Sequence, residues 1–140
     1  MSAVYLESSA VLAWLFGEAS AAEVIDAVDE AEVIVTSALT FAEAARAIRR
    51  AVAERRVKEA AARRLRGLLA RQRPGWVTMS VTQDVLARAG RAFPVEPVRT
   101  LDAIHLATAL EFTEALPELT MLVFDRRIGA NATALGLASV

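Results

Sequence analysis

The stretch Ala3–Ser9, which reads AVYLESS, indicates the fold class of this 140-residue chain. Its first four residues are apolar or aromatic and too few for a helix, so they predict a buried β-strand. Ser8 or Ser9 can then cap a helix that runs to about Phe16. Glu7 lies between the two elements, where it serves either as a strand-end or capping residue or as part of a site.

The same alternation of strand and helix continues along the chain. Apolar runs predict further strands at 32–36, 76–79 and 120–124, and Leu137–Val140 is a candidate edge strand. Continuous apolar strands separated by helices are typical of a parallel sheet covered on both faces. We therefore predict a single α/β domain over residues 1–140, with a central, mainly parallel sheet of four to five strands. The helices are expected at Ser20–Glu30, Thr40–Arg55, Val57–Arg71, Ser80–Ala92, Thr100–Ala115 and Asn131–Leu135, with Thr82 and Thr100 as candidate helix caps.

The composition excludes several kinds of site. The chain has no Cys, so disulfides, thiolate zinc sites and cysteine nucleophiles are excluded. Its one histidine, His105, cannot form a multi-histidine metal site. No glycine-rich phosphate loop is present, so a nucleotide-dependent mechanism lacks its usual cradle. Any bound metal must therefore be held by oxygen ligands, which favours Mg²⁺ or Mn²⁺.

The chain shows no sign of a membrane segment or a signal peptide. The apolar beginning lacks a basic leader, and no run reaches the ~18 apolar residues that span a bilayer. A cytoplasmic protein without a membrane partner is expected. Hydrophobic residues make up 55% of the chain, which is high for a monomer and indicates a surface that a partner or a second copy covers.

The charges are unevenly distributed although the formal net charge is only -1. Residues 46–73 hold eleven of the sixteen basic residues, while acids dominate elsewhere. Such segregation can steer a charged ligand. This cluster is either two solvated helix faces, an RNA platform or a surface that meets an acidic partner. Its members are Arg46, Arg49, Arg50, Arg55, Arg56, Lys58, Arg63, Arg64, Arg66, Arg71 and Arg73.

Two acids follow predicted strands. Glu7 follows the first strand and Asp125 follows the fourth, although Asp125 is also a common type of turn residue. Because ligands of open α/β sheets bind beyond the carboxyl ends of the strands, both acids are expected at one rim.

Two more acids lie in predicted first turns of helices. Asp102 shares a helix face with His105 and Leu106, and an acid on an apolar face is costly unless something satisfies it. Glu43 is either part of such a site or the acid of a capping box with Thr40.

Four clustered carboxylates repel one another, and each raises the pKa of the others. A divalent cation reverses that penalty, polarises a phosphoryl oxygen and activates a water. The acids Glu7, Glu43, Asp102 and Asp125 therefore predict a metal site suited to nuclease chemistry, with the basic cluster holding a negatively charged substrate.

Four motifs in their order and spacing resemble the PIN-domain ribonucleases, and most of all the toxins of bacterial VapBC toxin–antitoxin pairs. The resemblance extends from Val4 to the C-terminus. It implies a three-layer α/β/α fold, an Mg²⁺- or Mn²⁺-dependent endoribonuclease acting on RNA such as tRNA, a VapB-type antitoxin that blocks the site, and a homodimer or larger toxin–antitoxin assembly. The motifs are YLESSA, TFAEAARAI, RTLDAIHLATAL and LVFDRRIGANATALGL.

The resemblance also assigns residues by position. Glu43, Asp102 and Asp125 match the acidic positions of the family, which makes them, together with Glu7, the expected catalytic and metal-holding residues. Supporting positions are Ser9, the small hydroxyl residue near the metal, and Arg99 and Thr100, the RT before the central acid. Arg99, Arg126 and Arg127 are candidate RNA contacts.

One position departs from the family pattern, because Glu7 stands where the family normally has Asp. The extra methylene displaces the carboxylate by about a bond length, and a 1 Å misplacement can cost about 10²-fold in rate. The alternative function is therefore a catalytically impaired module that still binds the antitoxin and RNA. His105 is expected to pack in or cap the core, with proton shuttling as the alternative role.

Overall fold

Four short parallel strands form the centre of the molecule. The computed structural model describes residues 1–137. The strands are β1 (Ala3–Leu6), β2 (Val33–Ser37), β3 (Val77–Met79) and β4 (Thr120–Leu122). They pair in the order β3-β2-β1-β4, all parallel, so β1 is bonded on both sides. The predicted parallel α/β sheet is confirmed with four strands.

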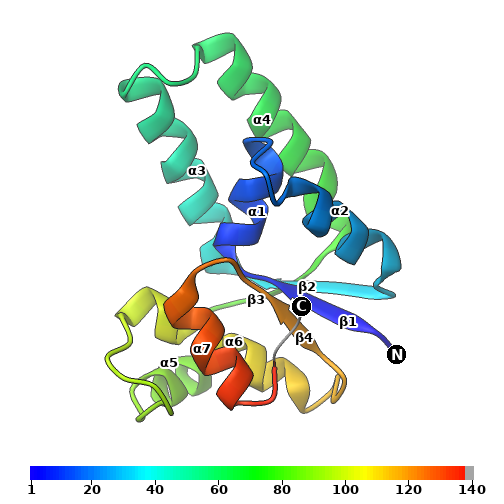
Figure 1. The fold of residues 1–140 in the computed structure, drawn as a ribbon, viewed down its shortest axis with the longest axis vertical. Helices are drawn as coiled ribbons and strands as arrows, with labels where there is room; N and C mark the ends of the chain where they lie inside the picture. The colour runs from blue at the N-terminus through cyan, green and yellow to red at the C-terminus, as the bar shows by residue number, and fades with distance from the viewer. Residues whose placement is uncertain (138–140) are drawn as a thin grey trace.

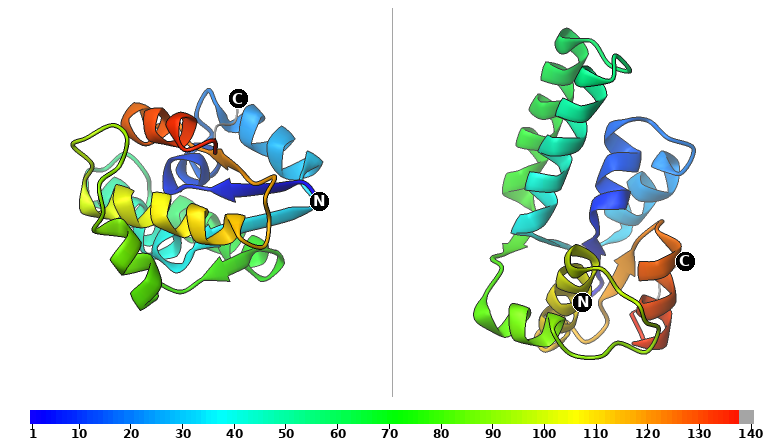
Figure 2. Two further views of the ribbon diagram at one scale, coloured as in Figure 1. Left: turned by 90° about the horizontal axis from the view of Figure 1, so that it is seen from below. Right: turned by 90° about the vertical axis from the view of Figure 1, so that its left-hand side faces the viewer.

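Seven α-helices cover the two faces of this sheet (Figure 1). The first four lie on one face and the last three on the other, and the two further views show the same three layers (Figure 2). Residues 138–140 of the candidate edge strand lie outside the described range. The helices are α1 (Ser8–Leu15), α2 (Ala21–Glu30), α3 (Ala38–Ala53), α4 (Glu59–Gln72), α5 (Gln83–Ala89), α6 (Thr100–Thr113) and α7 (Arg126–Ala134).

The alternation of side chains along β1 divides the core. Successive residues of a strand point to opposite faces, so Val4 and Leu6 pack with the α1–α4 layer, while Tyr5 packs with the α6–α7 layer. Both layers are closed by fully buried apolar side chains such as Ile48 and Leu106. Tyr5 therefore reaches α6 from the central strand.

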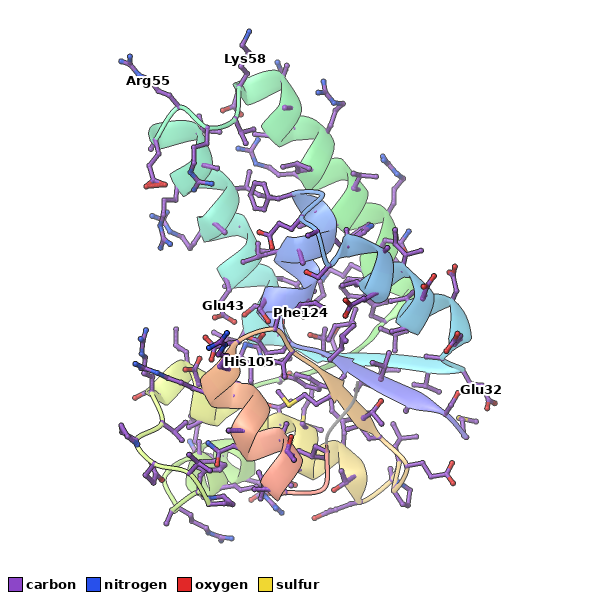
Figure 3. All side chains as sticks on the ribbon, in the orientation of Figure 1. Glu32, Glu43, Arg55, Lys58, His105 and Phe124 are labelled. Carbon is purple, nitrogen blue, oxygen red and sulfur yellow. The ribbon has the colours of Figure 1, made fainter. Side chains whose placement is uncertain are left out.

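Helices α3 and α4 form a hairpin that extends beyond the sheet (Figures 1 and 2). Ala44, Ala51 and Ala62 are fully buried in it, and such small side chains let helices approach closely. The labels of Arg55 and Lys58 mark the tip of this arm in Figure 3. The basic cluster of residues 46–73 therefore lies along a projecting arm, and most of its side chains are exposed.

The first turn of α3 differs from the prediction. The helix begins at Ala38, where the Ser37 hydroxyl accepts a hydrogen bond from the Leu39 backbone N–H at 3.1 Å. Thr40 lies inside the helix, and its hydroxyl accepts a hydrogen bond from the Thr36 hydroxyl at 2.8 Å. The predicted capping box between Thr40 and Glu43 is wrong, because Ser37 already satisfies the helix start.

Three other helix starts also differ from expectation. Glu7, rather than Ser8 or Ser9, caps α1. Arg99 occupies the N-cap position of α6 and makes no side-chain cap bond, so Thr100 is the first helical residue and not the cap. Helix α7 begins five residues before the predicted Asn131, because Asp125 caps it. In all three cases a residue earlier in the chain than the expected one takes the N-cap position. Thr82 caps α5 as predicted.

Candidate active site

The four predicted acids come from four different elements that converge at one rim of the sheet. Glu7 follows β1 directly, and Asp125 lies three residues beyond the end of β4. Asp102 lies in the first turn of α6, as expected. Glu43 is the sixth residue of α3, so it lies in the second turn rather than the predicted first. Figure 3 shows Glu43 close to His105, near the Phe124 label.

Glu7 is built into the start of α1. Its side chain is buried, with a residue exposure of 3%. One carboxylate oxygen accepts a hydrogen bond from the Ser8 hydroxyl, and the other accepts one from the Ser9 backbone N–H, both at 2.7 Å. The negative charge lies at the positive end of the helix dipole. The capping position predicted for Glu7 is therefore confirmed, and its role in a metal site stays a prediction.

Ser9 and Asp125 organise the connection from β4 to α7. The Ser9 hydroxyl accepts a hydrogen bond from the Phe124 backbone N–H at 2.9 Å. Oδ1 of Asp125 accepts hydrogen bonds from the Arg127 and Ile128 backbone N–H groups, at 2.9 and 3.2 Å. The other oxygen, Oδ2, has no hydrogen-bond partner within residues 1–137, so it remains available to a ligand.

Asp102 is the least satisfied of the four acids. Its half-buried carboxylate makes no hydrogen bond or ion pair to any residue that the structure describes. Burial raises the pKa of Asp102, and the Asp125 and Glu7 carboxylates raise it further, against opposing effects of Arg99 and His105. The three acids are therefore close enough to repel one another at the same rim.

Glu43 has a different partner from the other acids. Its Oε1 lies 2.5 Å from Nε2 of His105, while Oε1 of Glu7 lies 4.0 Å from the same nitrogen. On the other side of the ring, the Tyr5 hydroxyl lies 2.7 Å from Nδ1. His105 and Tyr5 are both fully buried. The expectation that His105 belongs to the core is correct, but the residue also contacts an acid of the site.

The donor set suits a hard divalent cation, since all four groups are carboxylates. Even so, no three His, Asp or Glu side chains within residues 1–137 are arranged to hold a metal ion. Glu7 and Asp125 turn toward the helices that they cap, and Glu43 turns toward His105. The mutual repulsion that raises the pKa of Asp102 is the kind of strain that a cation relieves.

The remaining predicted residues surround the acids. Arg99 and Thr100 are exposed at the start of α6, and Arg99 is near enough to lower the pKa of Asp102. Arg126 and Arg127 are exposed at the start of α7. Arg126 and Phe124 line a shallow pocket of about 430 Å³ beside Asp125. The structure thus places all the predicted residues near this rim of the sheet.

Comparisons with known proteins identify the family. Residues 4–133 match the family model of the PIN domain. The chain belongs to the PIN-domain family. Ribonuclease VapC35 of Mycobacterium tuberculosis, from two strains, is 32% identical over 139 residues, which cover 98% of this chain and 95% of VapC35. This PIN domain is therefore a homologue of the VapC ribonucleases.

A solved structure supports the fold of this PIN domain. The crystal structure of VapC20 from Mycobacterium tuberculosis, described as a toxin that cleaves the sarcin-ricin loop, superposes with a TM-score of 0.67. The match covers 98% of each chain at 18% sequence identity. The predicted resemblance to VapC-type PIN domains and the predicted architecture are both confirmed. None of the helices within residues 1–137 is long and apolar enough to cross a membrane.

Sequence reasoning did not assign a role to Tyr5 in the site of this PIN domain. The signal was present but weak: Tyr5 is the one polar-tipped side chain in an otherwise apolar strand, two residues before Glu7. A buried tyrosine hydroxyl usually requires a hydrogen-bond partner. That partner, His105, lies one hundred residues away in the sequence, so no local pattern could identify it.

Proposed function

We propose that this chain is a metal-dependent endoribonuclease toxin, in which Glu7, Glu43, Asp102 and Asp125 hold Mg²⁺ or Mn²⁺ and cut RNA in the cytoplasm. The observation that carries this proposal is the state of Asp102. Its carboxylate is half-buried and without a hydrogen-bond partner in the described chain, and two further carboxylates raise its pKa. Such an arrangement is unfavourable without a cation and favourable with one.

The acids and the surrounding arginines have different roles in the proposed reaction. Asp102 and the open oxygen of Asp125 are the groups that most readily accept a cation, since neither is taken up by another donor in residues 1–137. Glu7 adds negative charge from a fixed position at the start of α1. A bound Mg²⁺ or Mn²⁺ supplies Lewis-acid polarisation of the phosphate and neutralises developing negative charge. Arg99, Arg126 and Arg127 lie around the acids as exposed cations that can orient phosphates.

The arm offers a track for the RNA backbone. Residues three and seven positions apart share a helix face, so Arg46 and Arg50 continue the face of Glu43 along α3. Both arginines are exposed. A phosphate backbone bound along this face would enter the acidic rim at Glu43. The relatives named above act on RNA, and this basic face supports an RNA substrate for the present chain.

The decisive experiment is RNA cleavage by the purified protein with Mn²⁺, with Mg²⁺ and with EDTA. Cleavage that requires the metal and disappears in Asp102→Asn supports the proposal. Asp84→Asn is the matched control, because Asp84 is an exposed acid in the first turn of α5 and is not among the groups that shift the pKa of Asp102. Unchanged cleavage by Asp102→Asn would exclude the assignment.

We also propose a VapB-type antitoxin as the protein partner. A groove of about 560 Å³ lies between the end of α1 and α4. Its floor is apolar, with Phe16, Leu65 and Leu68, and Arg63 and Arg64 line it as exposed cations. This combination suits an amphipathic acidic segment. Copurification of the toxin with the product of a neighbouring small reading frame, lost in Arg63→Glu/Arg64→Glu, tests this partner.

A homodimer is part of the same proposal. Three apolar side chains are exposed at one edge of the sheet: Val77 on β3, Val81 just after β3, and Leu86 on α5. Exposed apolar side chains grouped at a sheet edge favour association. Sedimentation equilibrium of the wild-type protein and of Leu86→Glu measures it: the substitution should shift a dimer toward monomer.

The second candidate function is a binding module with impaired chemistry. It is favoured by the observation that both oxygens of Glu7 are already hydrogen-bonded at the start of α1. Such a module would bind RNA and the antitoxin with no metal-dependent cleavage. Cleavage assays on Glu7→Asp separate the two functions.

A further inference from the structure

A buried chain of three side chains lies directly behind the acidic rim. Tyr5 of β1, His105 of α6 and Glu43 of α3 are joined in that order by distances of 2.7 and 2.5 Å. The His105 ring is fully buried, and it meets the Tyr5 ring edge-on, with centroids 5.9 Å apart. Both ring nitrogens therefore have a partner inside the protein, and only Glu43, with its side chain 23% exposed, reaches the surface.

The partners decide where the ring hydrogen lies. Tyr5 is fully buried, and its phenol hydroxyl, which has a proton to donate, faces Nδ1 of the ring at 2.7 Å. Tyr5 then donates to Nδ1 of His105. A ring with its hydrogen on Nε2 satisfies both contacts, because this nitrogen then donates to the carboxylate oxygen of Glu43.

His105 cannot act on RNA itself. It has no exposed surface, and its Nε2 faces the Glu43 and Glu7 carboxylates. The site groups nearest to its Nε2 are the carboxylates of Glu43 at 2.5 Å and Glu7 at 4.0 Å, so its strongest contact with the site is through these acids. Of these two, only Glu43 lies within hydrogen-bond distance.

We propose that His105 is a positioning residue that holds the Glu43 carboxylate in the orientation needed at the acidic rim, with Tyr5 fixing the imidazole in the donating tautomer. This inference rests on the proposed metal-dependent function. Glu43 has no other hydrogen-bond partner in the described chain, and a free glutamate side chain samples several rotamers. A hydrogen bond from a locked ring removes that freedom, as residues behind metal ligands commonly do.

The test compares Mn²⁺ affinity in the absence of RNA, measured by calorimetry, with RNA cleavage at several RNA concentrations. His105→Leu removes the donor and should weaken Mn²⁺ binding or lower kcat by about 10–100-fold, with little change in KM. His105→Gln keeps an N–H near the position of Nε2 and should recover most of the loss. Tyr5→Phe keeps the ring and should give a smaller loss in the same direction.

Two controls separate positioning from a general loss of structure. Thr113→Val removes another hydroxyl of α6, which donates to the Leu110 carbonyl at the opposite end of the helix from Asp102, and should change Mn²⁺ affinity little. In a Glu43→Gln background, His105→Leu should cost far less than it does in the wild type, because the group that it positions has been altered. Thermal unfolding reports the folded fraction of each variant.

The outcomes are distinct. Equal Mn²⁺ affinity and kcat in wild type and His105→Leu overturn the positioning role while the nuclease proposal stands. An equal loss from His105→Leu in both backgrounds also overturns it. If His105→Leu fails to fold, Tyr5→Phe against Thr113→Val decides, and equal Mn²⁺ affinity in these two variants overturns it. If the wild type binds Mn²⁺ but cuts no RNA, the nuclease proposal fails and the affinities still test the positioning. A wild type that binds no Mn²⁺ overturns both.

Discussion

The hydroxyl oxygen of Ser9 accepts a hydrogen bond of 2.9 Å from the backbone N–H of Phe124, which ties the start of α1 to the loop that carries Asp125. Ser9 also donates its backbone N–H to Glu7. One serine therefore contacts the segments that present two of the four acids, although those segments are more than one hundred residues apart in the chain.

Replacing Ser9 by Ala should lower both stability and cleavage. The partly buried Phe124 N–H loses its partner, which should cost about 1 kcal/mol, the low end of the penalty for an unsatisfied buried donor. Urea unfolding measures the stability, and metal-dependent cleavage measures the site. Ser20→Ala is the matched control, because Ser20 stands at the N-cap position of α2 without a side-chain cap bond. Equal effects of the two substitutions would contradict this role of Ser9.

Replacing Asp102 by Asn should stabilise the metal-free protein at neutral pH while abolishing metal-dependent cleavage. The folded-state pKa of Asp102 is raised above its ordinary value of 3.8, so the folded protein binds this proton more tightly than the unfolded chain does. The free energy of unfolding therefore falls as the pH rises from 3.8 through the raised folded-state pKa of Asp102. Above that pKa, ionised Asp102 destabilises the folded protein.

Thermal unfolding of wild type and Asp102→Asn across this pH range checks the sign. The variant should melt a few degrees higher at pH 7, and the difference should shrink as Asp102 becomes protonated at lower pH. Added Mn²⁺ should raise the melting temperature of the wild type only. A variant that melts lower than wild type at pH 7 would show that the Asp102 carboxylate is stabilised by contacts other than a cation.

Replacing Glu7 by Gln should remove cleavage without removing the fold. The amide oxygen can accept from the Ser9 N–H and the amide nitrogen can donate to the Ser8 hydroxyl, so the cap is kept while the charge is lost. Glu7→Asp should change cleavage little, since the charge stays at the helix start. A gain of about 10²-fold in Glu7→Asp, the scale of a 1 Å misplacement, would support the impaired module instead.

Replacing Arg46 and Arg50 together by Ala should weaken RNA binding and flatten its salt dependence. Each lost phosphate contact reduces the slope of log K against log salt by about one, so the pair should reduce it by about two. Fluorescence anisotropy at several salt concentrations measures this slope. Arg56→Ala is the control on the same arm, because Arg56 already pairs with Glu54 at 2.8 Å. An unchanged slope in the double variant would place the RNA elsewhere.

The fold and the rim were predictable because their signals are local. Short apolar runs define the strands, and an acid directly after a strand is at the rim by the geometry of parallel sheets. The helix starts were harder to predict. Ser8, Thr40 and Thr100 are all good capping residues, but the actual cap depends on which nearby side chain is not hydrogen-bonded elsewhere. Ser37 caps α3 since Thr40 bonds to Thr36 instead.

The direction of the carboxylates was not predictable. The sequence shows that Glu43 and His105 are polar residues on apolar helices, but only the fold, which brings α3 and α6 from opposite faces of the sheet to the same rim (Figure 1), determines that they meet. Likewise, the local sequence around Asp125 is the same whether this residue is a turn residue, a helix cap or an acid of the site. The structure shows that Asp125 caps α7 with one oxygen and leaves the other open.

The central position of β1 also determines how this site can be lost. The strand is hydrogen-bonded to β2 on one side and β4 on the other, and it holds Tyr5 while ending at Glu7. The parts of a protein that open at low free energy are those with few buried contacts. All four residues of β1 are buried, so this strand is not such a part. Backbone amides of β1 should thus be among the slowest to exchange with deuterium, and the site should persist until the whole domain unfolds.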